Sequence, residues 1–519
     1  MKYYIIIFKL VLVFIQTLSQ EFSLIKGKSD IDLGSTNIHK IFANDDSFFY
    51  VLKHYGNQFY IAQFDNLMNK IEEKPVKLYE GLKSFELESI IYFHGKIYVF
   101  ASRRTFNSKK LYFKTIDKKT LKSDVPFNEL IDIKYIKGNW ADLYFTLSRS
   151  ETKLLIACIT KVFLSKIQYN EFYVFDKDLS LVWSIKDFYE YKGQGPRDNI
   201  FVVDDYNNVS ILSLIKRQSI FTYLFSEEKN LYNIYRYTEN GKTFKSFPIT
   251  LKEKFIKSIK ITDDNEGNLI CCGLYSDLLR PGIKGIFFIK ISNENSNIIA
   301  KQLNELPLDF LEKIKIFKEP FIEEDELMKY EVTDVVPRKN NTITLIAEQI
   351  FEQNYDTYNT LIISNLNVDG NINWITFIPK RQSFSDISYL DSFNISIQYF
   401  RDLIRNTGQK FDLFQNLCSY ALLSPIEGND IVIIYNDHIK NLKNPEKIKS
   451  FGHHRKSILI AVHIDEYGNL KYIPLKQWQK KLLYPEPIRY YATLKNTIII
   501  PAFKGRKYYY YKIDFNNLN

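Results

Sequence analysis

The feature that most constrains this chain is a short apolar and aromatic run that ends in Asp, Asn, Ser or Thr and recurs eight times. Turn residues and another strand-like run follow most copies. The copies are spaced 52, 59, 62, 54, 75, 98 and 49 residues apart, which is typical of a repeat architecture. They are FYIAQFD ending at Asp65, LYFKTID at Asp117, FYVFD at Asp176, NIYRYT at Thr238, FFIKIS at Ser292, TLIISNLN at Asn367, ILIAVHID at Asp465 and YYYYKID at Asp514.

Most copies are also preceded by a pair of short runs joined by a turn, as at His94-Gly95 and Glu266-Gly267. Gly and Asn supply the positive φ that tight hairpins require. Each unit therefore predicts four antiparallel strands in a meander. Such a sheet cannot bury both faces alone, but copies arranged radially bury one another. The sequence predicts an all-β fold, a β-propeller of about eight four-stranded blades, with seven as the alternative.

The two ends of the chain predict how the ring closes. The last copy ends at Asp514 with only five residues beyond it, so its fourth strand is missing. The segment from Glu21 to Lys40 has no blade of its own. We expect a strand around Phe22–Ile25 or Ile38–Phe42 to complete the last blade and remove its open edge. Residues 21–519 are thus expected to form one propeller domain.

Two long gaps between copies predict insertions with short helices on one face of the ring. Residues 304–330 carry helix-period apolar positions broken by Pro320, and residues 380–417 repeat Phe400, Leu403 and Ile404 at helical spacing. Inserted loops on a rigid scaffold often bind partners, although they can equally be decorated connections.

The amino terminus predicts a signal peptide over residues 1–20. Lys2 precedes an apolar run from Tyr3 to Ile15 that only Lys9 interrupts, and polar or small residues follow. The run is short for a spanning helix, which needs about 20 apolar residues, although an uncleaved anchor is the alternative. We expect cleavage near Ser19 or Gln20 and a mature protein that is secreted or held in the cell envelope (periplasm or cell surface), without a membrane span.

Composition excludes some classes of protein. The chain is 45% apolar and 16% aromatic, so it is neither disordered nor collagen-like. Its 70 Lys and Arg residues are interspersed with 60 Asp and Glu residues, without a basic block of the kind that binds nucleic acid. Cys158, Cys271, Cys272 and Cys418 lie in apolar stretches without a CxxC spacing. They are expected to be buried thiols, with a long-range disulfide as the alternative.

The search for chemistry identifies no catalytic set, no metal site and no cofactor motif, since no G-x-S-x-G, H-E-x-x-H, P-loop or dinucleotide fingerprint occurs. The binding candidates are His453, His454 and Arg455, just before a predicted strand, although adjacent side chains diverge in a strand. Asp263–Gly267 comes nearest to a calcium loop but is better read as a turn. The acidic row Glu323–Glu326 is expected to be a solvated helix start.

In its signal peptide and four-stranded repeats, the chain resembles secreted β-propeller repeat proteins across residues 22–519, without a Trp-Asp, kelch or YWTD motif. The expected function is an exported, non-enzymatic interaction protein, which binds a protein or glycan at the cell envelope through loops on one face. The alternative is a propeller glycoside hydrolase or lyase that acts on polysaccharide, with acids from several blades. The protein is expected to be a monomer without cofactors or nucleic-acid partners.

Overall fold

The computed structural model describes most of the chain, and structural statements below concern these residues: 22–31, 37–45, 47–55, 58–123, 125–134, 140–161, 167–190, 199–216, 230–278, 282–316, 322–323, 326–351, 357–383, 418–425, 428–442, 447–450, 457–477, 484–485, 487, 490–492, 496–504 and 507–515. The predicted signal peptide lies outside them.

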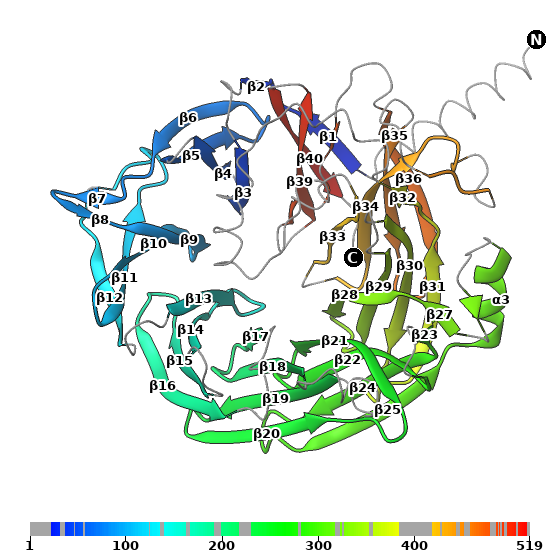
Figure 1. The fold of residues 1–519 in the computed structure, drawn as a ribbon. Coiled ribbons are helices and arrows are strands. Elements are labelled where there is room, and N and C mark those ends of the chain that lie inside the picture. The colour runs from blue at the N-terminus through cyan, green and yellow to red at the C-terminus, as the bar shows by residue number, and fades with distance from the viewer. Residues whose placement is uncertain are drawn as a thin grey trace, which may run out of the picture.

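The strands form eight antiparallel sheets arranged around a common axis (Figure 1), so the predicted propeller of eight four-stranded blades is confirmed. Within a blade the strands follow chain order from the axis outward. The first four blades are β3 (Asn37–Asn44), β4 (Phe48–Tyr55), β5 (Gln58–Asp65) and β6 (Lys70–Pro75); β9 (Glu86–Phe93), β10 (Lys96–Arg104), β11 (Ser108–Ile116) and β12 (Asn128–Lys134); β13 (Trp140–Leu147), β14 (Leu154–Lys161), β15 (Ile167–Phe175) and β16 (Leu181–Glu190); and β17 (Asn199–Val203), β18 (Val209–Lys216), β19 (Asn230–Thr238) and β20 (Thr243–Ile249).

The remaining blades carry more additions. Blade 5 is β21 (Phe255–Asp263), β22 (Leu269–Ser276), β24 (Gly285–Ile291) and β25 (Ile298–Glu305); blade 6 is β28 (Tyr330–Pro337), β29 (Ile343–Phe351), β30 (Thr357–Leu366) and β31 (Ile372–Ile378); blade 7 is β33 (Ala421–Leu423), β34 (Ile431–His438), β35 (Ser457–Ile464) and β36 (Leu470–Gln477). Blade 8 joins β37 (Tyr484–Pro485), β38 (Tyr491–Ala492), β39 (Thr497–Lys504) and β40 (Lys507–Phe515) to β1 (Phe22–Lys26) and β2 (Asp30–Ile31). The other elements are β7 (Tyr79–Glu80), β8 (Lys83–Ser84), β23 (Gly282–Ile283), helix α3 (Leu308–Ile316), β26 (Ile322–Glu323), β27 (Glu326–Met328) and β32 (Gln382–Ser383).

All eight runs predicted from the sequence are the third strand of a blade, namely β5, β11, β15, β19, β24, β30, β35 and β40. This strand has a blade-mate on each side and a neighbouring blade on each face. Its side chains are therefore apolar on both faces, and the polar residue at its end begins the turn to the outer strand.

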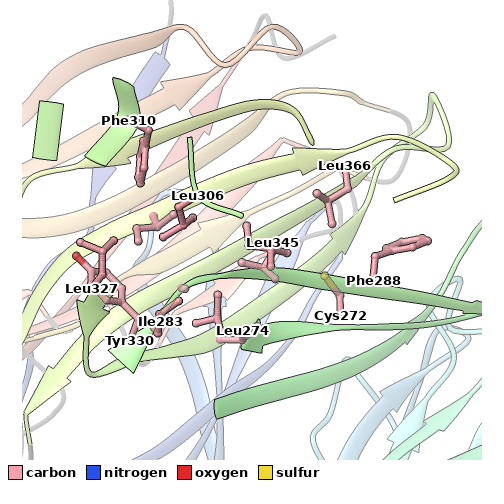
Figure 2. Packing of buried hydrophobic residues seen from close by; sticks show 14 of the residues in the cluster. Cys272, Leu274, Ile283, Phe288, Leu306, Phe310, Leu327, Tyr330, Leu345 and Leu366 are labelled. Carbon is pink, nitrogen blue, oxygen red and sulfur yellow. The ribbon is translucent and has the colours of Figure 1, made fainter. Parts of the chain in front are cut away.

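The hydrophobic core is divided into layers between adjacent blades. Each of eight large clusters joins one blade to the next, and the last joins blade 8 to blade 1 through residues such as Phe49, Phe64 and Tyr510. Figure 2 shows the layer between blades 5 and 6, where Cys272 and Phe288 face Leu345 and Leu366, and Phe310 of α3 extends the layer outward. Because each sheet is covered only by its neighbours, burial of the apolar surface requires the complete ring.

The N-terminal strand completes the last blade, as predicted. β1 pairs antiparallel with β40 in the register Phe22↔Phe515 to Lys26↔Tyr511, and it forms the outer strand. The following residues then reach blade 1. Asp30 is buried and forms ion pairs with Lys53 and, at 2.7 Å, with Lys70, and Lys53 also lies 2.9 Å from Glu73.

Two expectations need correction, and a third falls mostly outside the described residues. The alternative closing strand Ile38–Phe42 lies within β3, the inner strand of blade 1, so the segment without a blade ends before Asn37 rather than at Lys40. The insertion predicted over 304–330 begins later, because residues 304 and 305 belong to β25, and it holds one helix, α3, followed by β26 and β27. Most of the second insertion, residues 384–417, lies outside the described residues.

Two further expectations concern burial and membranes. All four cysteines are buried and none forms a disulfide, in agreement with the sequence. Within the ranges given above, no helix is long and apolar enough to cross a membrane.

Candidate functional site

The antiparallel meander gives the ring two different faces. The turns between first and second strands and between third and fourth strands lie on one face, here called the turn face. The connections between second and third strands, and between one blade and the next, lie on the other, here called the loop face. The turn face is built from turns of a few residues. The loop face holds the long connections, including the segments that contain α3 and residues 384–417.

The turns of the turn face are fixed by the side chain that begins them. Asp204 Oδ1 accepts hydrogen bonds from the backbone N–H groups of Tyr206 and Asn208, at 2.9 and 2.8 Å. The same pattern of acceptance, from the second and fourth following N–H groups, recurs at Asp65, Asp176, Asp264, Asn367 and Asp465. These side chains satisfy backbone donors that no strand can reach, so the polar residues at these six positions are structural.

Aromatic side chains tie these turns to neighbouring blades. Trp374 of blade 6 donates its Nε1–H to the Glu466 carbonyl of blade 7 at 2.8 Å, and its ring lies against Gly468. Trp183 of blade 3 does the same with the Asn207 carbonyl and Gly241 of blade 4. Both glycines have positive φ, and a Cβ there would meet the indole ring at less than 3 Å.

Arg149 braces the turn face across several blades. It lies in the first turn of blade 3, and its guanidinium donates to Asn265 Oδ1 of blade 5 at 2.6 Å and to the Pro337 carbonyl of blade 6 at 2.8 Å. The turn of blade 4 also binds blade 3, because Asp205 Oδ1 accepts from Ser148 and Ser150 at 2.5 Å each. The polar groups of the turn face are therefore largely bonded to one another.

Asp263, at the end of β21, has unusual electrostatics. It is 8% exposed, and burial raises the pKa of its carboxyl to about 7, with a further contribution from the negative charge of Asp204 and an opposing one from Arg149. A carboxyl that keeps its proton near neutral pH is one requirement of a general acid. Asp263 directly precedes the first turn of blade 5 and is buried among the bonded turns, so we regard it as a structural group.

The inner strands carry a different set of polar side chains near the ring axis, midway between the two faces. Lys260 of β21 donates to the Thr333 carbonyl of β28 at 2.5 Å. The Tyr420 hydroxyl, just before β33, contacts both the Thr333 hydroxyl and the Asp334 carboxylate. Burial and the adjacent Asp334 raise the pKa of Tyr420, so its hydroxyl stays protonated. Lys260, Thr333 and Asp334 are partly exposed, so this polar cluster of blades 5, 6 and 7 is accessible from the axis.

Lys257 lies three residues before Lys260 on β21 and is therefore closer to the loop face. Its ammonium donates to the Leu278 carbonyl at 2.6 Å, and burial lowers its pKa to about 8, against the opposing effect of Glu326. A partly buried ammonium with a lowered pKa is a strong hydrogen-bond donor for anionic or hydroxyl groups. Lys260, Asp334 and Tyr420 meet around Thr333. Together with Lys257, three residues earlier on β21, they are here called the candidate binding cluster.

A buried ionic network holds the two ends of the 384–417 connection. Lys380 forms an ion pair with Glu348, whose other oxygen accepts from Ser419 Oγ at 2.7 Å, so residues on both sides of the connection meet at one carboxylate. Gln382 donates to the Asn436 carbonyl of blade 7 at 2.8 Å. Next to this network, burial raises the pKa of Asp437 to about 7. The start and the end of this insertion are thus rigidly placed on the loop face.

The structure tests some of the site residues predicted from the sequence and not others. The binding candidates His453, His454 and Arg455 lie outside the described residues. In Asp263–Gly267, Asp264 caps its turn and bonds Lys290 at 2.8 Å, in agreement with turn chemistry. The solvated helix start predicted for Glu323–Glu326 is wrong at Glu326, which is buried in β27 and accepts from Ser276 Oγ at 2.9 and 3.0 Å. No group of three or more His, Cys, Asp or Glu residues that could hold a metal occurs in the part of the chain described here.

Sequence reasoning missed the candidate binding cluster altogether. Its members come from β21, β28 and the start of blade 7, and no motif or spacing connects them. One signal was available in the sequence: lysines recur every third residue at Lys254, Lys257 and Lys260, which breaks the alternation of a regular strand. In the structure, the register of β21 is irregular between Ile256 and Ser258.

No family model matches this chain, and no curated protein matches it. Solved structures resemble it in fold. A prolyl endopeptidase shares 7% identity at a TM-score of 0.36, over 83% of this chain and 46% of its own. The NanB sialidase of Streptococcus pneumoniae shares 8% identity at a TM-score of 0.32, over 96% of both chains. Prolyl oligopeptidase B of Galerina marginata shares 8% identity at a TM-score of 0.39, over 91% of this chain and 56% of its own. This chain spans about half the length of the two peptidases.

Proposed function

We propose that this chain is an exported, non-enzymatic binding protein that holds a protein or glycan ligand on its loop face. The observation that carries the proposal is the contrast in bonding between the faces. Asp and Asn side chains of the turn face are used in capping turns and in bracing blades. The loop face instead carries the long connections on rigid stems, and scaffold loops of this kind commonly bind ligands.

The candidate binding cluster supplies the polar part of the proposed site. Lys257 and Lys260 offer ammonium donors, and the partly exposed Asp334, held in place by the buried Tyr420 hydroxyl, offers an acceptor. Such a set recognises hydroxyl and carboxylate groups, which occur on sugars and on protein side chains alike.

The test combines a glycan array with pull-down from the envelope fraction of the host. The double variant Lys257→Ala/Lys260→Ala removes two ammonium groups from the candidate binding cluster. A matched variant, Lys177→Ala/Lys242→Ala, removes two exposed lysines from the turn face and changes the net charge equally. We expect the first variant to lose the ligand and the second to keep it. Equal retention by both would contradict the proposed site.

The alternative function, cleavage of a polysaccharide, is favoured by one arrangement. Asp334 and Tyr420 contact each other beside Lys260, which brings a carboxylate, a phenol and an ammonium together. These are the group types of acid–base catalysis on sugars. Release of reducing ends by the parent protein, abolished in Tyr420→Phe, would establish this alternative in place of simple binding.

A further inference from the structure

Two hairpin tips on the loop-face side of blade 2 expose large apolar side chains to solvent and lie outside the candidate binding cluster. The first is the β7–β8 hairpin in the connection from blade 1 to blade 2, which extends beyond the outline of the ring in Figure 1. Leu82 at its apex is 107% exposed, and Tyr79 at its base is 60% exposed. Gly81, with φ +57°, allows the tight turn that presents Leu82 to solvent.

The second tip is the connection between β10 and β11, where Phe106 is 72% exposed. The loop is fixed rather than loose. Thr105 donates its backbone N–H to the Ser108 carbonyl at 2.8 Å, and Ser108 N–H donates to Thr105 Oγ1 at 3.0 Å. Phe106 is thus presented at the apex of a closed turn. A preordered side chain loses little conformational entropy on binding.

Basic side chains surround the two tips. Arg103 and Lys83 are exposed, and so is Lys77 just before β7. Arg104, at the end of β10, lies 3.4 Å from Glu86, the first residue of β9, so the chain that leaves the β7–β8 hairpin runs beside the start of the β10–β11 connection. The acidic groups of the two hairpin segments, residues 77–86 and 103–107, are Glu80 and Glu86, and Glu80 accepts the Phe127 backbone N–H at 2.6 Å. These segments hold four basic groups against two acidic ones, so they carry a net positive charge.

We propose that these two tips dock on the surface of an anionic lipid bilayer, with Leu82 and Phe106 entering the interface and the basic residues facing the lipid headgroups. Transfer of a Leu or Phe side chain out of water favours insertion, and basic residues near an anionic surface add electrostatic attraction. The proposal concerns the rim of blade 2 and is independent of the ligand at the ring axis.

The shape of the tips favours a bilayer over the other occupants. Apolar apices on two separate hairpins are convex and small, whereas a stable protein interface needs roughly 800 Å² of complementary surface on each partner. A fluid bilayer adapts to convex tips. Sugars stack on flat aromatic platforms, and an aliphatic apex such as Leu82 offers none.

The test places an environment-sensitive NBD fluorophore at one tip position at a time. The four native cysteines are buried, so Leu82→Cys and Phe106→Cys each provide one accessible thiol. The matched control is Leu67→Cys, an exposed leucine (61%) on the turn face. The full chain is used, and the probe reports its own position, so residues 1–20, common to all variants, do not affect the comparison.

On vesicles of phosphatidylcholine with phosphatidylglycerol, we expect the probes at positions 82 and 106 to brighten several-fold and shift to the blue, while the probe at position 67 does not respond. On pure phosphatidylcholine, or at high salt, the response should weaken. In unlabelled protein, Leu82→Ser and Phe106→Ser should each lower vesicle partitioning about tenfold, with the melting temperature unchanged. No response at either tip, an equal response at position 67, or a response to an acidic polysaccharide in place of vesicles would overturn the proposal.

Discussion

The two faces of this ring are built from the same repeated strands but differ in what their polar residues do. On the turn face, Asp204 and its counterparts cap short turns, and Arg149 connects blades 3, 5 and 6. On the inner strands, Lys260, Asp334 and Tyr420 gather near the axis, and on the loop face two hairpins expose apolar tips at the rim. The comparison teaches that a propeller can concentrate its structural hydrogen bonds on one face and leave the other for binding.

The largest predicted effect compares a glycine from each face. At Gly370 of the turn face, φ is +89° and a Cβ would lie 2.3 Å from Phe288, whereas at Gly81 of the loop-face hairpin φ is +57° and no atom lies within 4 Å of the added Cβ. Gly370→Ala should lower the free energy of unfolding by about 2–4 kcal/mol, through backbone strain and overpacking together. Gly81→Ala should lower it by about 1 kcal/mol, through strain alone.

Urea denaturation of both variants measures this difference. Similar losses at the two positions would break the distinction between a packed turn face and an open loop-face rim.

The second effect is a pH dependence carried by Asp263. Its pKa is about 7 in the folded protein, above the ordinary value of 3.8, because burial disfavours the charged carboxylate. Below pH 4 both folded and unfolded forms hold the proton. As the pH rises to 7 the unfolded form releases it first, so the free energy of unfolding falls, by about 1–3 kcal/mol.

Asp263→Asn removes this titration, so the variant should gain stability relative to the parent as the pH rises from 4 to 7 and keep a constant advantage above it. Asp437→Asn, between blades 6 and 7, should show the same direction, since burial also raises the pKa of Asp437 to about 7. Thermal melts across this pH range provide the measurement. A parallel pH profile for parent and Asp263→Asn would show that the carboxyl ionises freely.

The smallest effects compare two arginines. Arg149→Ala on the turn face removes two interblade hydrogen bonds and should lower the free energy of unfolding by about 1–2 kcal/mol. Arg103→Ala on the loop face removes an exposed side chain and should change it by less than about 0.5 kcal/mol. Chemical denaturation resolves the two, and an equal cost at both positions would argue against bracing by Arg149.

The sequence could predict the blades because each blade repeats a local pattern. The apolar runs that end at residues such as Asp65 and Asp465 mark third strands, and the run that ends at Asp514 lacked a following partner strand, which β1 supplies. Local patterns could not decide between Phe22–Ile25 and Ile38–Phe42 as the closing strand. The decision depends on which of the two segments forms the inner strand of blade 1, and in the structure that is Ile38–Phe42, within β3.

The candidate site could not be predicted in the same way. Lys260 and Tyr420 both reach Thr333 only because the ring arranges β21, β28 and β33 around one axis, and Arg149 reaches Pro337 across 188 residues for the same reason. The prediction for Glu323–Glu326 was wrong at Glu326 because a row of acidic residues in a sequence normally indicates a solvent-exposed segment. In the folded chain, Ser276 and the nearby Lys257 stabilise the buried Glu326 carboxylate.

Both faces exist only if the ring is closed, so closure is the central claim. Ser23 Oγ lies 3.3 Å from Asp514 Oδ2 in the β1–β40 pair, across 491 residues of chain. In the variant Ser23→Cys/Asp514→Cys, mild oxidation should form a disulfide that accelerates migration on a non-reducing gel and raises the melting temperature, while Ser23→Cys/Lys83→Cys should stay uncrosslinked. Failure of the first pair to crosslink in the folded protein would contradict the closed ring and the division of its faces.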